Sequence, residues 1–117
     1  MPPILVPFVA ALSFAAAAAP PAPRPPFVDG LIEGFNALPV GRPPASIVRY
    51  RYRGQLVYFV PARCCDVPSA LYDAEGRRLC TPDGGFAGGD DRCLDFFEQR
   101  REETLIWHDA RDPRPSR

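Results

Sequence analysis

The spacing of hydrophobic residues predicts a helix near the start of the chain. In residues 27–38, FVDGLIEGFNAL, apolar positions recur three or four residues apart, which is the spacing of one helical face. The positions in this stripe are Phe27, Leu31, Phe35 and Leu38. Two glycines inside the segment weaken the helix by about 1 kcal/mol each relative to alanine. We expect the stripe to cover one face of a sheet.

Residues 46–62, SIVRYRYRGQLVYFVPA, predict a β-hairpin. Two β-rich runs alternate with period two around Arg53-Gly54. With that pair as the loop, Tyr52 lies opposite Gln55 and Val48 lies opposite Phe59. One face then holds Val48, Tyr50, Tyr52, Val57 and Phe59, and the other holds Arg49, Arg51, Leu56, Tyr58 and Val60. A slip of one residue would exchange the two faces.

Four further segments complete the predicted domain. Residues 69–80 indicate a second hairpin with a turn at 73–76 and with Leu71 and Leu79 facing inward. Residues 81–93 contain four glycines and no periodicity, so we expect a loop with Phe86 as its apolar anchor. LDFF (94–97) returns to the core, and TLIWHD (104–109) indicates a last strand, with Leu105 and Trp107 on one side and Ile106 on the other.

These segments indicate a single α+β domain over residues 27–109. One N-terminal helix packs on a small antiparallel sheet of two hairpins plus a C-terminal strand, with two disulfides. Residues 20–26 are a Pro-rich linker, and residues 110–117 are too polar and Pro-rich to pack, so we expect a disordered tail. A domain this small has a marginal core and gains from cross-links.

Residues 1–19 have the pattern of a signal peptide. They are almost wholly apolar, carry no charged side chain and end in small residues. The alternative is an uncleaved membrane anchor, although the apolar stretch is short for a full span. We therefore expect an exported, periplasmic or extracellular protein with no membrane span after cleavage.

Charge is balanced overall but segregated along the chain. The sequence holds 14 basic and 14 acidic residues, which argues against nucleic acid as a partner. Residues 42–63 contain five arginines and no acid, whereas residues 83–103 contain seven acids and three arginines. Either the two segments neutralise each other across neighbouring strands, or an outward face of Arg49, Arg51 and Tyr58 binds an acidic or aromatic partner.

The four cysteines, Cys64, Cys65, Cys80 and Cys93, predict two disulfides in an oxidising compartment. Neighbouring Cys64 and Cys65 cannot bond each other without distortion, which leaves two of three connectivities. We favour Cys64 with Cys93 and Cys65 with Cys80. A zinc site lacks the usual C-x2-C pairs and has only His108 to add, and a redox centre lacks the C-x-x-C motif.

The residues that suggest chemistry are few. Asp83, Asp90, Asp91 and Asp95 gather around the glycine-rich segment, where flexible acidic loops can bind calcium, although the spacing is not that of an EF-hand. The alternative is a solvated loop with tight turns, in which Asp95 caps a local turn. The single histidine, His108, and the serines show no catalytic motif, so we expect no enzyme and no obligatory cofactor.

Residues 48–97 resemble a family of small exported bacterial domains of unknown function. The shared pattern is a Tyr-rich hairpin, Cys-Cys-Asp, a Leu-Tyr-Asp turn with Gly, a Cys followed by Pro and Gly-Gly, and Gly-Asp before a last Cys and Asp-Phe. The matching positions are Tyr58, Cys64, Cys65, Asp66, Leu71, Tyr72, Asp73, Gly76, Cys80, Pro82, Gly84, Gly85, Asp90, Cys93, Asp95 and Phe96. Many relatives look like lipoproteins, but this chain has no cysteine near the cleavage region. The resemblance implies export and cystine links and gives no activity.

Together these patterns favour a non-catalytic binding or inhibitor-like module of the cell envelope. Its partner would be a protein or another envelope component, bound through the Arg/Tyr hairpin face or the glycine loop. A calcium-stabilised structural module is the second hypothesis, and a small enzyme is the third.

Overall fold

The computed structural model describes residues 2–5, 7, 10, 24–64, 66–86 and 88–112. Within these ranges the elements are α1 (Pro26–Asn36), β1 (Ser46–Tyr52), β2 (Gln55–Val60), β3 (Ala70–Tyr72), β4 (Arg78–Cys80), α2 (Phe96–Gln99) and β5 (Arg101–His108). The strands form one antiparallel sheet in the order β4-β3-β2-β1-β5. The predicted α+β class, with one main helix and a sheet of two hairpins plus a C-terminal strand, is confirmed. None of the described helices is long and apolar enough to cross a membrane.

The β1–β2 hairpin has the predicted register. Tyr52 pairs with Gln55 and Val48 pairs with Phe59. Arg53 and Gly54 form the turn with φ of 50° and 75°, so both have the positive φ of a two-residue turn that matches the twist of the strands. Because side chains alternate along each strand, the hairpin contributes to both faces of the sheet.

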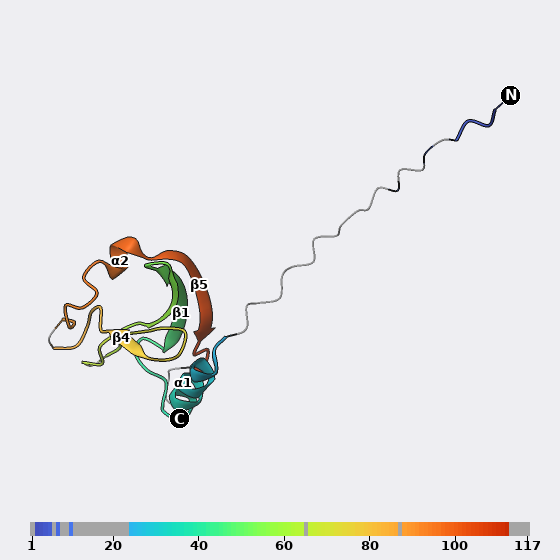
Figure 1. The fold of residues 1–117 in the computed structure, drawn as a ribbon. Helices are drawn as coiled ribbons and strands as arrows, with labels where there is room; N and C mark the ends of the chain where they lie inside the picture. Colours follow the sequence, from blue (N-terminus) through green and yellow to red (C-terminus); the bar gives the residue numbers. More distant parts are fainter. Residues whose placement is uncertain are drawn as a thin grey trace.

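A separate hydrophobic core lies on each face of the sheet. Under α1, the buried residues are Val28, Ile47, Tyr58 and Val60. On the opposite face, they are Tyr50, Tyr52, Val57, Phe59, Leu71, Cys80, Cys93 and Phe96. Figure 1 shows β1 and β5 curving side by side, with α2 at the top and α1 at the bottom of the folded part.

Prolines at both ends delimit α1. Pro26 is tolerated at the first helical position, where its missing N–H needs no partner. Pro39 disfavours helical geometry at the residue before it, so the helix ends at Asn36 and not at the predicted residue 38. Leu38 is consequently 59% exposed, and Val28 is fully buried in the core under α1.

Arg111 binds the end of α1, although the sequence places this residue in a disordered tail. Its guanidinium donates hydrogen bonds to the backbone oxygens of Phe35, Asn36 and Leu38 at 3.1, 3.3 and 2.9 Å. It also pairs with the buried carboxylate of Asp109 at 2.8 Å. These contacts add hydrogen-bond donors at the C-terminal end of α1, where the Phe35 oxygen also accepts from the Leu38 N–H at 3.1 Å. The folded part therefore extends past residue 109, and residues 113–117 lie outside the described residues.

The faces predicted for the last strand are wrong. Ile47 pairs with Trp107 but Val48 pairs with Leu105, so Ile106 is an extra residue at a register shift. Such a bulge changes the alternation of side chains along the strand. Ile106 and Trp107 both pack in the core under α1, where Trp107 stacks on Phe35 at 5.8 Å between ring centroids, and Leu105 is 62% exposed.

The favoured cysteine pairing is also wrong. Cys80, at the end of β4, is bonded to Cys93, with 6.1 Å between their Cα atoms. Both connectivities considered reasonable join Cys80 to Cys64 or Cys65, so both are excluded. The glycine-rich segment turns back on itself and brings its own two ends together. Cys65 lies outside the described residues, so the second predicted disulfide, which needs it, falls outside this description.

Candidate functional site

The glycine loop, residues 81–93, is fixed at its base and along one side. The Cys80–Cys93 disulfide closes it, and Thr81 and Asp90 exchange two hydrogen bonds of 3.0 Å. The buried Ser69 hydroxyl donates to the Asp83 carbonyl oxygen at 2.9 Å and accepts from the Asp83 N–H at 3.0 Å. A loop held by this many contacts keeps a defined shape before it meets any ligand.

Two positions in the loop require glycine. Gly84 has a φ of 83°, and a Cβ there would lie 2.5 Å from the Cβ of Ala62. Gly89 has a φ of 118°, and its Cβ would lie 2.9 Å from the Pro82 carbonyl oxygen. Positive φ and close backbone approach both favour a residue without a Cβ.

Phe86 points into solvent instead of anchoring the loop, so the prediction of an inward anchor is wrong. The residue is 100% exposed. The base of the loop is held instead by the disulfide and the Ser69 contacts. A cavity of about 270 Å³ beside Phe86 is also lined by Asp66, Pro68 and Asp90. The loop therefore presents an aromatic ring next to acidic side chains.

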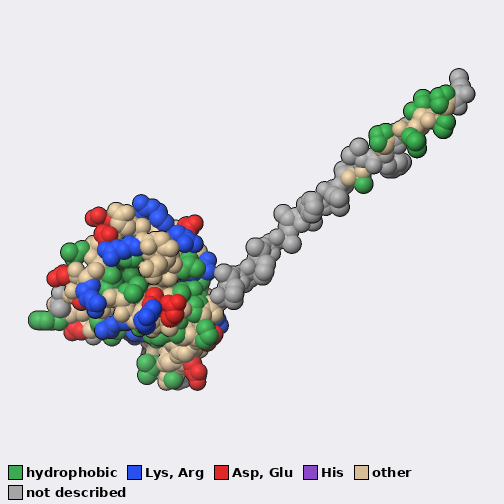
Figure 2. Space-filling view, viewed as in Figure 1, with side chains coloured by type: hydrophobic (Ala, Val, Ile, Leu, Met, Phe, Trp, Pro, Cys, Tyr) green, Lys and Arg blue, Asp and Glu red, His purple; other side chains and the backbone are tan. Residues whose placement is uncertain are grey.

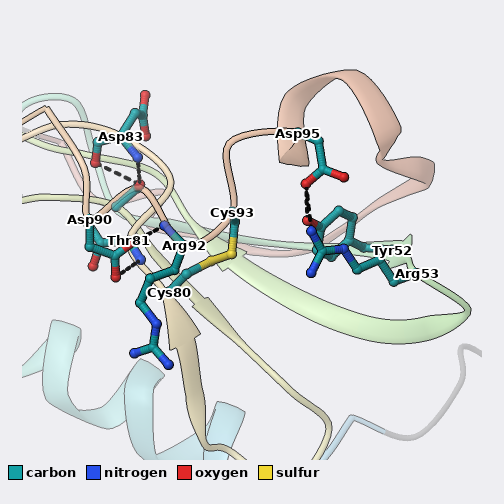
Figure 3. Close-up of a disulfide and its surroundings, with 10 residues drawn as sticks. Tyr52, Arg53, Cys80, Thr81, Asp83, Asp90, Arg92, Cys93 and Asp95 are labelled. Atoms are coloured by element: carbon teal, nitrogen blue, oxygen red, sulfur yellow. Dashed lines mark hydrogen bonds and ion pairs between the residues drawn. A yellow bond between two sulfur atoms is a disulfide. The ribbon is translucent and has the colours of Figure 1, made fainter.

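The four aspartates do not converge on one point. Figure 3 shows Asp83 and Asp90 on one side of the disulfide and Asp95 on the other. Asp95 accepts hydrogen bonds from the Tyr52 hydroxyl and from Arg53 Nη2, the latter at 3.1 Å. The part of the chain that the structure describes has no group of three His, Cys, Asp or Glu side chains able to hold a metal ion. Among the described residues, Asp83, Asp90, Asp91 and Asp95 are therefore not gathered into one cluster, and the calcium interpretation stays a prediction.

Hydrogen bonds keep two of these carboxyls ionised. The bond from Tyr52 lowers the pKa of Asp95 from its usual value. Burial raises the pKa of Asp90, but the N–H groups of Arg92 and Thr81 outweigh it and lower that pKa overall. Both side chains act as acceptors that fix the loop and the hairpin turn.

A second cavity, of about 260 Å³, lies between the hairpin turn and the disulfide. Its lining residues are Tyr52, Arg53, Gln55, Val57, Leu79, Arg92 and Cys93. Arg53 stands 4.9 Å from the centre of the Tyr52 ring, and burial together with the bond to Asp95 raises the pKa of the Tyr52 phenol. Figure 3 shows Arg53 beside Tyr52, and Arg92 next to the disulfide.

The hairpin face predicted to bind a partner is not a continuous exposed surface. Tyr58 lies opposite Arg49 as predicted but is buried under Phe27, with 5.5 Å between their ring centroids, so its inclusion in an exposed binding face is wrong. Arg51 pairs with Glu102 at 2.8 Å, and Arg49 is half-buried opposite Tyr58 and Thr104.

The segregated charges of the sequence meet across the fold. Arg51–Glu102 and Arg53–Asp95 each join the arginine-rich segment to the acidic one. On the face seen in Figure 2, arginines lie among acidic and apolar side chains instead of forming one basic patch. Mutual neutralisation is thus confirmed at these two pairs.

Tyr50 forms a polar cluster with Arg100 and Glu103 that the sequence did not reveal. Its hydroxyl donates to Glu103 Oε1 at 2.5 Å and accepts from Arg100 Nη1 at 3.2 Å. Burial, followed by the bond to Glu103, raises the pKa of Tyr50 to about 12. At neutral pH the phenol is therefore protonated, and its hydroxyl links the buried Tyr50 ring to Glu103 on β5.

Several residues of the two cavities were not predicted as functional. Arg92 and Gln55 come together only through the disulfide and the hairpin, so their separation along the chain hides their proximity. The apolar character of Phe86 predicts an interior position, whereas its glycine neighbours indicate the exposed turn that the structure has. His108 lies exposed at the end of β5, opposite Ser46.

A protein-family model described as a domain of unknown function (DUF6970) matches residues 33–109, more than half of the 117-residue chain. The chain belongs to this family. The DUF6970 match spans the whole sheet, the glycine loop and both cavities. A relation to a family of unknown function is thereby confirmed, and the shared cysteine framework and bacterial origin stay predictions. No curated protein and no solved structure matches the chain.

Proposed function

We propose that this DUF6970 domain is a non-catalytic, inhibitor-like binding module of the cell envelope. It inserts Phe86 into an apolar pocket of a partner protein. The observation that carries the proposal is the complete exposure of Phe86 on a loop that is otherwise tied down. Burying a phenylalanine side chain stabilises a complex by about 1.5–3 kcal/mol, and aromatic anchors commonly dominate protein interfaces.

The shape of the loop supports a role in binding. The disulfide and the hydrogen bonds to Ser69 and within the Thr81–Asp90 pair hold the glycine loop. A partner then binds a loop already in place, so little conformational entropy is lost on association. This preorganisation is the reason for the comparison with inhibitors.

The surroundings of Phe86 indicate the character of the partner. Asp66 and Asp90 line the same cavity as Phe86, and both are exposed. A partner pocket with a basic rim and an apolar floor would complement an aromatic ring between carboxylates. We expect association to weaken as ionic strength rises, because salt screens such rim charges.

The cell envelope enters the proposal through two features. Residues 1–19 have a signal-like composition, and the Cys80–Cys93 disulfide is of a kind that persists in oxidising compartments. Intact-mass measurement of the exported protein, with and without reduction, tests this part. A mature mass that retains residues 1–19 would contradict export with signal cleavage.

Site-specific photo-crosslinking tests the binding surface. We expect p-benzoylphenylalanine at position 86 to yield a discrete adduct with one protein in the native host. The same group at position 105, which replaces another exposed residue on β5, should yield none. Equal yields of adduct at positions 86 and 105 would contradict the proposal.

Variants distinguish the glycine loop from the hairpin face. In pull-down with the partner that cross-linking identifies, Phe86→Ser should abolish binding, whereas Phe86→Trp should retain it. The double change Arg49→Glu and Arg51→Glu should leave capture intact if the loop is the contact. Capture lost only in the arginine variant would transfer the function to the hairpin.

A further inference from the structure

The cavity beside the hairpin turn has the composition of a small ligand site. Val57, Leu79 and Cys93 supply apolar lining, and Arg53, Gln55 and Arg92 supply polar groups. Its volume of about 260 Å³ equals roughly nine water molecules at about 30 Å³ each. This is slightly below the usual range for drug-sized ligands. The cavity therefore suits a group about the size of one amino-acid residue.

Its two arginines differ in how their charge is balanced. Arg53 Nη2 pairs with Asp95 at 3.1 Å. Within the described residues, no carboxylate oxygen lies within 4.0 Å of the Arg92 guanidinium. The Asp90 carboxylate, two residues away in sequence, accepts from the backbone N–H groups of Thr81 and Arg92, and its charge attracts the Arg92 guanidinium from beyond 4.0 Å. One positive charge at the cavity is thus left without an ion-pair partner in this part of the chain.

We propose that this cavity binds a small organic carboxylate with a compact apolar body, either a free acid or the carboxyl-terminal residue of a peptide. Arg92 pairs with the carboxylate, because a guanidinium matches a carboxylate through two parallel hydrogen bonds. The Gln55 amide donates to the same group, and the apolar body packs on Val57 and Leu79. Tyr52 and Asp95 act as positioning residues, because their contacts hold Arg53 at the rim.

The site is independent of the Phe86 surface. The two cavities share no lining residue, and Asp66, Phe86 and Asp90 belong to the other one. A ligand in the hairpin cavity is therefore compatible with a partner on the glycine loop. Failure of one site leaves the other intact, so the two proposals can be tested separately.

Titration of the full chain by amide-resolved NMR tests the ligand class. We expect N-acetyl-leucine to shift the amide signals of Gln55, Arg92 and Cys93. The neutral N-acetyl-leucinamide should bind with an affinity at least about ten-fold lower, because it lacks the charge that pairs with Arg92. Equal binding of acid and amide, or no shift with either at about 10 mM, would overturn the proposal.

A third probe separates the two sources of carboxylate. The peptide acetyl-Gly-Gly-Leu, with a free carboxyl end, should bind as well as N-acetyl-leucine if the cavity accepts peptide ends. Binding of N-acetyl-leucine alone assigns the site to free acids. Either result supports a carboxylate site.

Substitutions at the arginine complete the test. Arg92→Gln should weaken N-acetyl-leucine binding by about ten-fold, and Arg92→Lys should restore part of it, since a lysine keeps the charge but not the forked geometry. Arg42→Gln changes an exposed arginine that does not line the cavity and should leave binding unchanged. An Arg92→Gln variant that folds and binds like the parent would refute the assignment.

Discussion

Arg111 Nη2 lies 3.1 Å from the backbone oxygen of Phe35, although 76 positions separate the two residues. A cation at the C-terminal end of a helix also interacts favourably with the helix dipole. We expect Arg111→Gln to lower the melting temperature by several degrees, as followed by far-UV circular dichroism.

The matched control for this change is Arg42→Gln. Arg42 is exposed and has no side-chain hydrogen bond or ion pair among the described contacts, so its replacement should leave the melting temperature unchanged. Equal melting temperatures for the Arg111→Gln variant and the parent would show that the C-terminal contact is dispensable.

Tyr50 predicts a loss of stability at alkaline pH. Its pKa is raised to about 12 in the folded protein, whereas an unfolded chain loses this proton near pH 10. Between these values the native state binds more protons than the unfolded state, so the free energy of unfolding falls as pH rises. Below about pH 10 the contribution is constant. Urea unfolding from about pH 9 to pH 12 measures the slope.

The Tyr50→Phe variant should show a shallower decline over the same pH interval, because it lacks the titrating group. Tyr52 also has a raised pKa, so some slope should remain. An unchanged slope in the variant would mean that Tyr50 does not titrate as described.

Adjacent phenylalanines in α2 should differ in their effects on stability. Phe96 is 0% exposed and contacts the rings of Tyr50, Tyr52 and Phe59, whereas Phe97 is 40% exposed. We expect Phe96→Ala to cost about 3–5 kcal/mol. Phe97→Ala should cost about 1–2 kcal/mol in the same denaturant titration. If Phe96→Ala does not fold, Phe96→Leu replaces it, and a smaller loss for Phe96→Leu than for Phe97→Leu would contradict this core.

Glycine-to-alanine changes at two positions should have opposite effects on the free energy of unfolding. Gly30 lies exposed inside α1, and nothing lies within 4 Å of a Cβ built there. Gly30→Ala should stabilise the protein by about 0.5–1 kcal/mol. Gly76 has a φ of 88°, and its Cβ would lie 2.8 Å from Phe27, so Gly76→Ala should cost more than about 1 kcal/mol. Thermal unfolding of both variants checks the signs, and a stabilising Gly76→Ala would disprove the packing of Phe27 on this turn.

The disulfide assignment predicts one linked pair of tryptic peptides. Cleavage after Arg78, Arg92 and Arg100 releases peptides 79–92 and 93–100, which should remain joined through Cys80 and Cys93 until reduction. Peptide 64–77, which holds Cys64 and Cys65, should not be linked to either one. A mass corresponding to all three peptides joined together would instead indicate the long-range pairing expected from the sequence.

The register of the first hairpin was predictable because alternation and the Arg53-Gly54 turn specify it locally. The faces of β5 were not, because the shift at Ile47/Val48 depends on how two distant strands pair. Cysteine pairing failed for a similar reason. Opposite sides of an extended Cys-Cys segment suggested two long-range bridges, and the way glycines fold a loop back on itself has no periodic signature.

The binding residues were harder to predict than the fold. Phe86 was placed inside on the rule that apolar residues are buried, and that rule does not hold for every exposed side chain. Arg49, Arg51 and Tyr58 were grouped by strand alternation, which cannot show that α1 covers Tyr58. Arg92 contributes to a cavity only because the chain folds back at Cys93.

The β1–β2 hairpin contributes to both hydrophobic cores, since its alternate side chains enter the core under α1 and the core under α2. Both faces of this hairpin carry buried side chains. An inserted residue would therefore shift the alternation and move apolar side chains from each core to the opposite face. In the glycine loop, Gly84, Gly89 and the contacts of Asp83 and Asp90 are fixed, whereas the side chain of Phe86 packs against neither core. Substitution of the Phe86 side chain should therefore leave folding intact, whereas an insertion between residues 47 and 60 should prevent it.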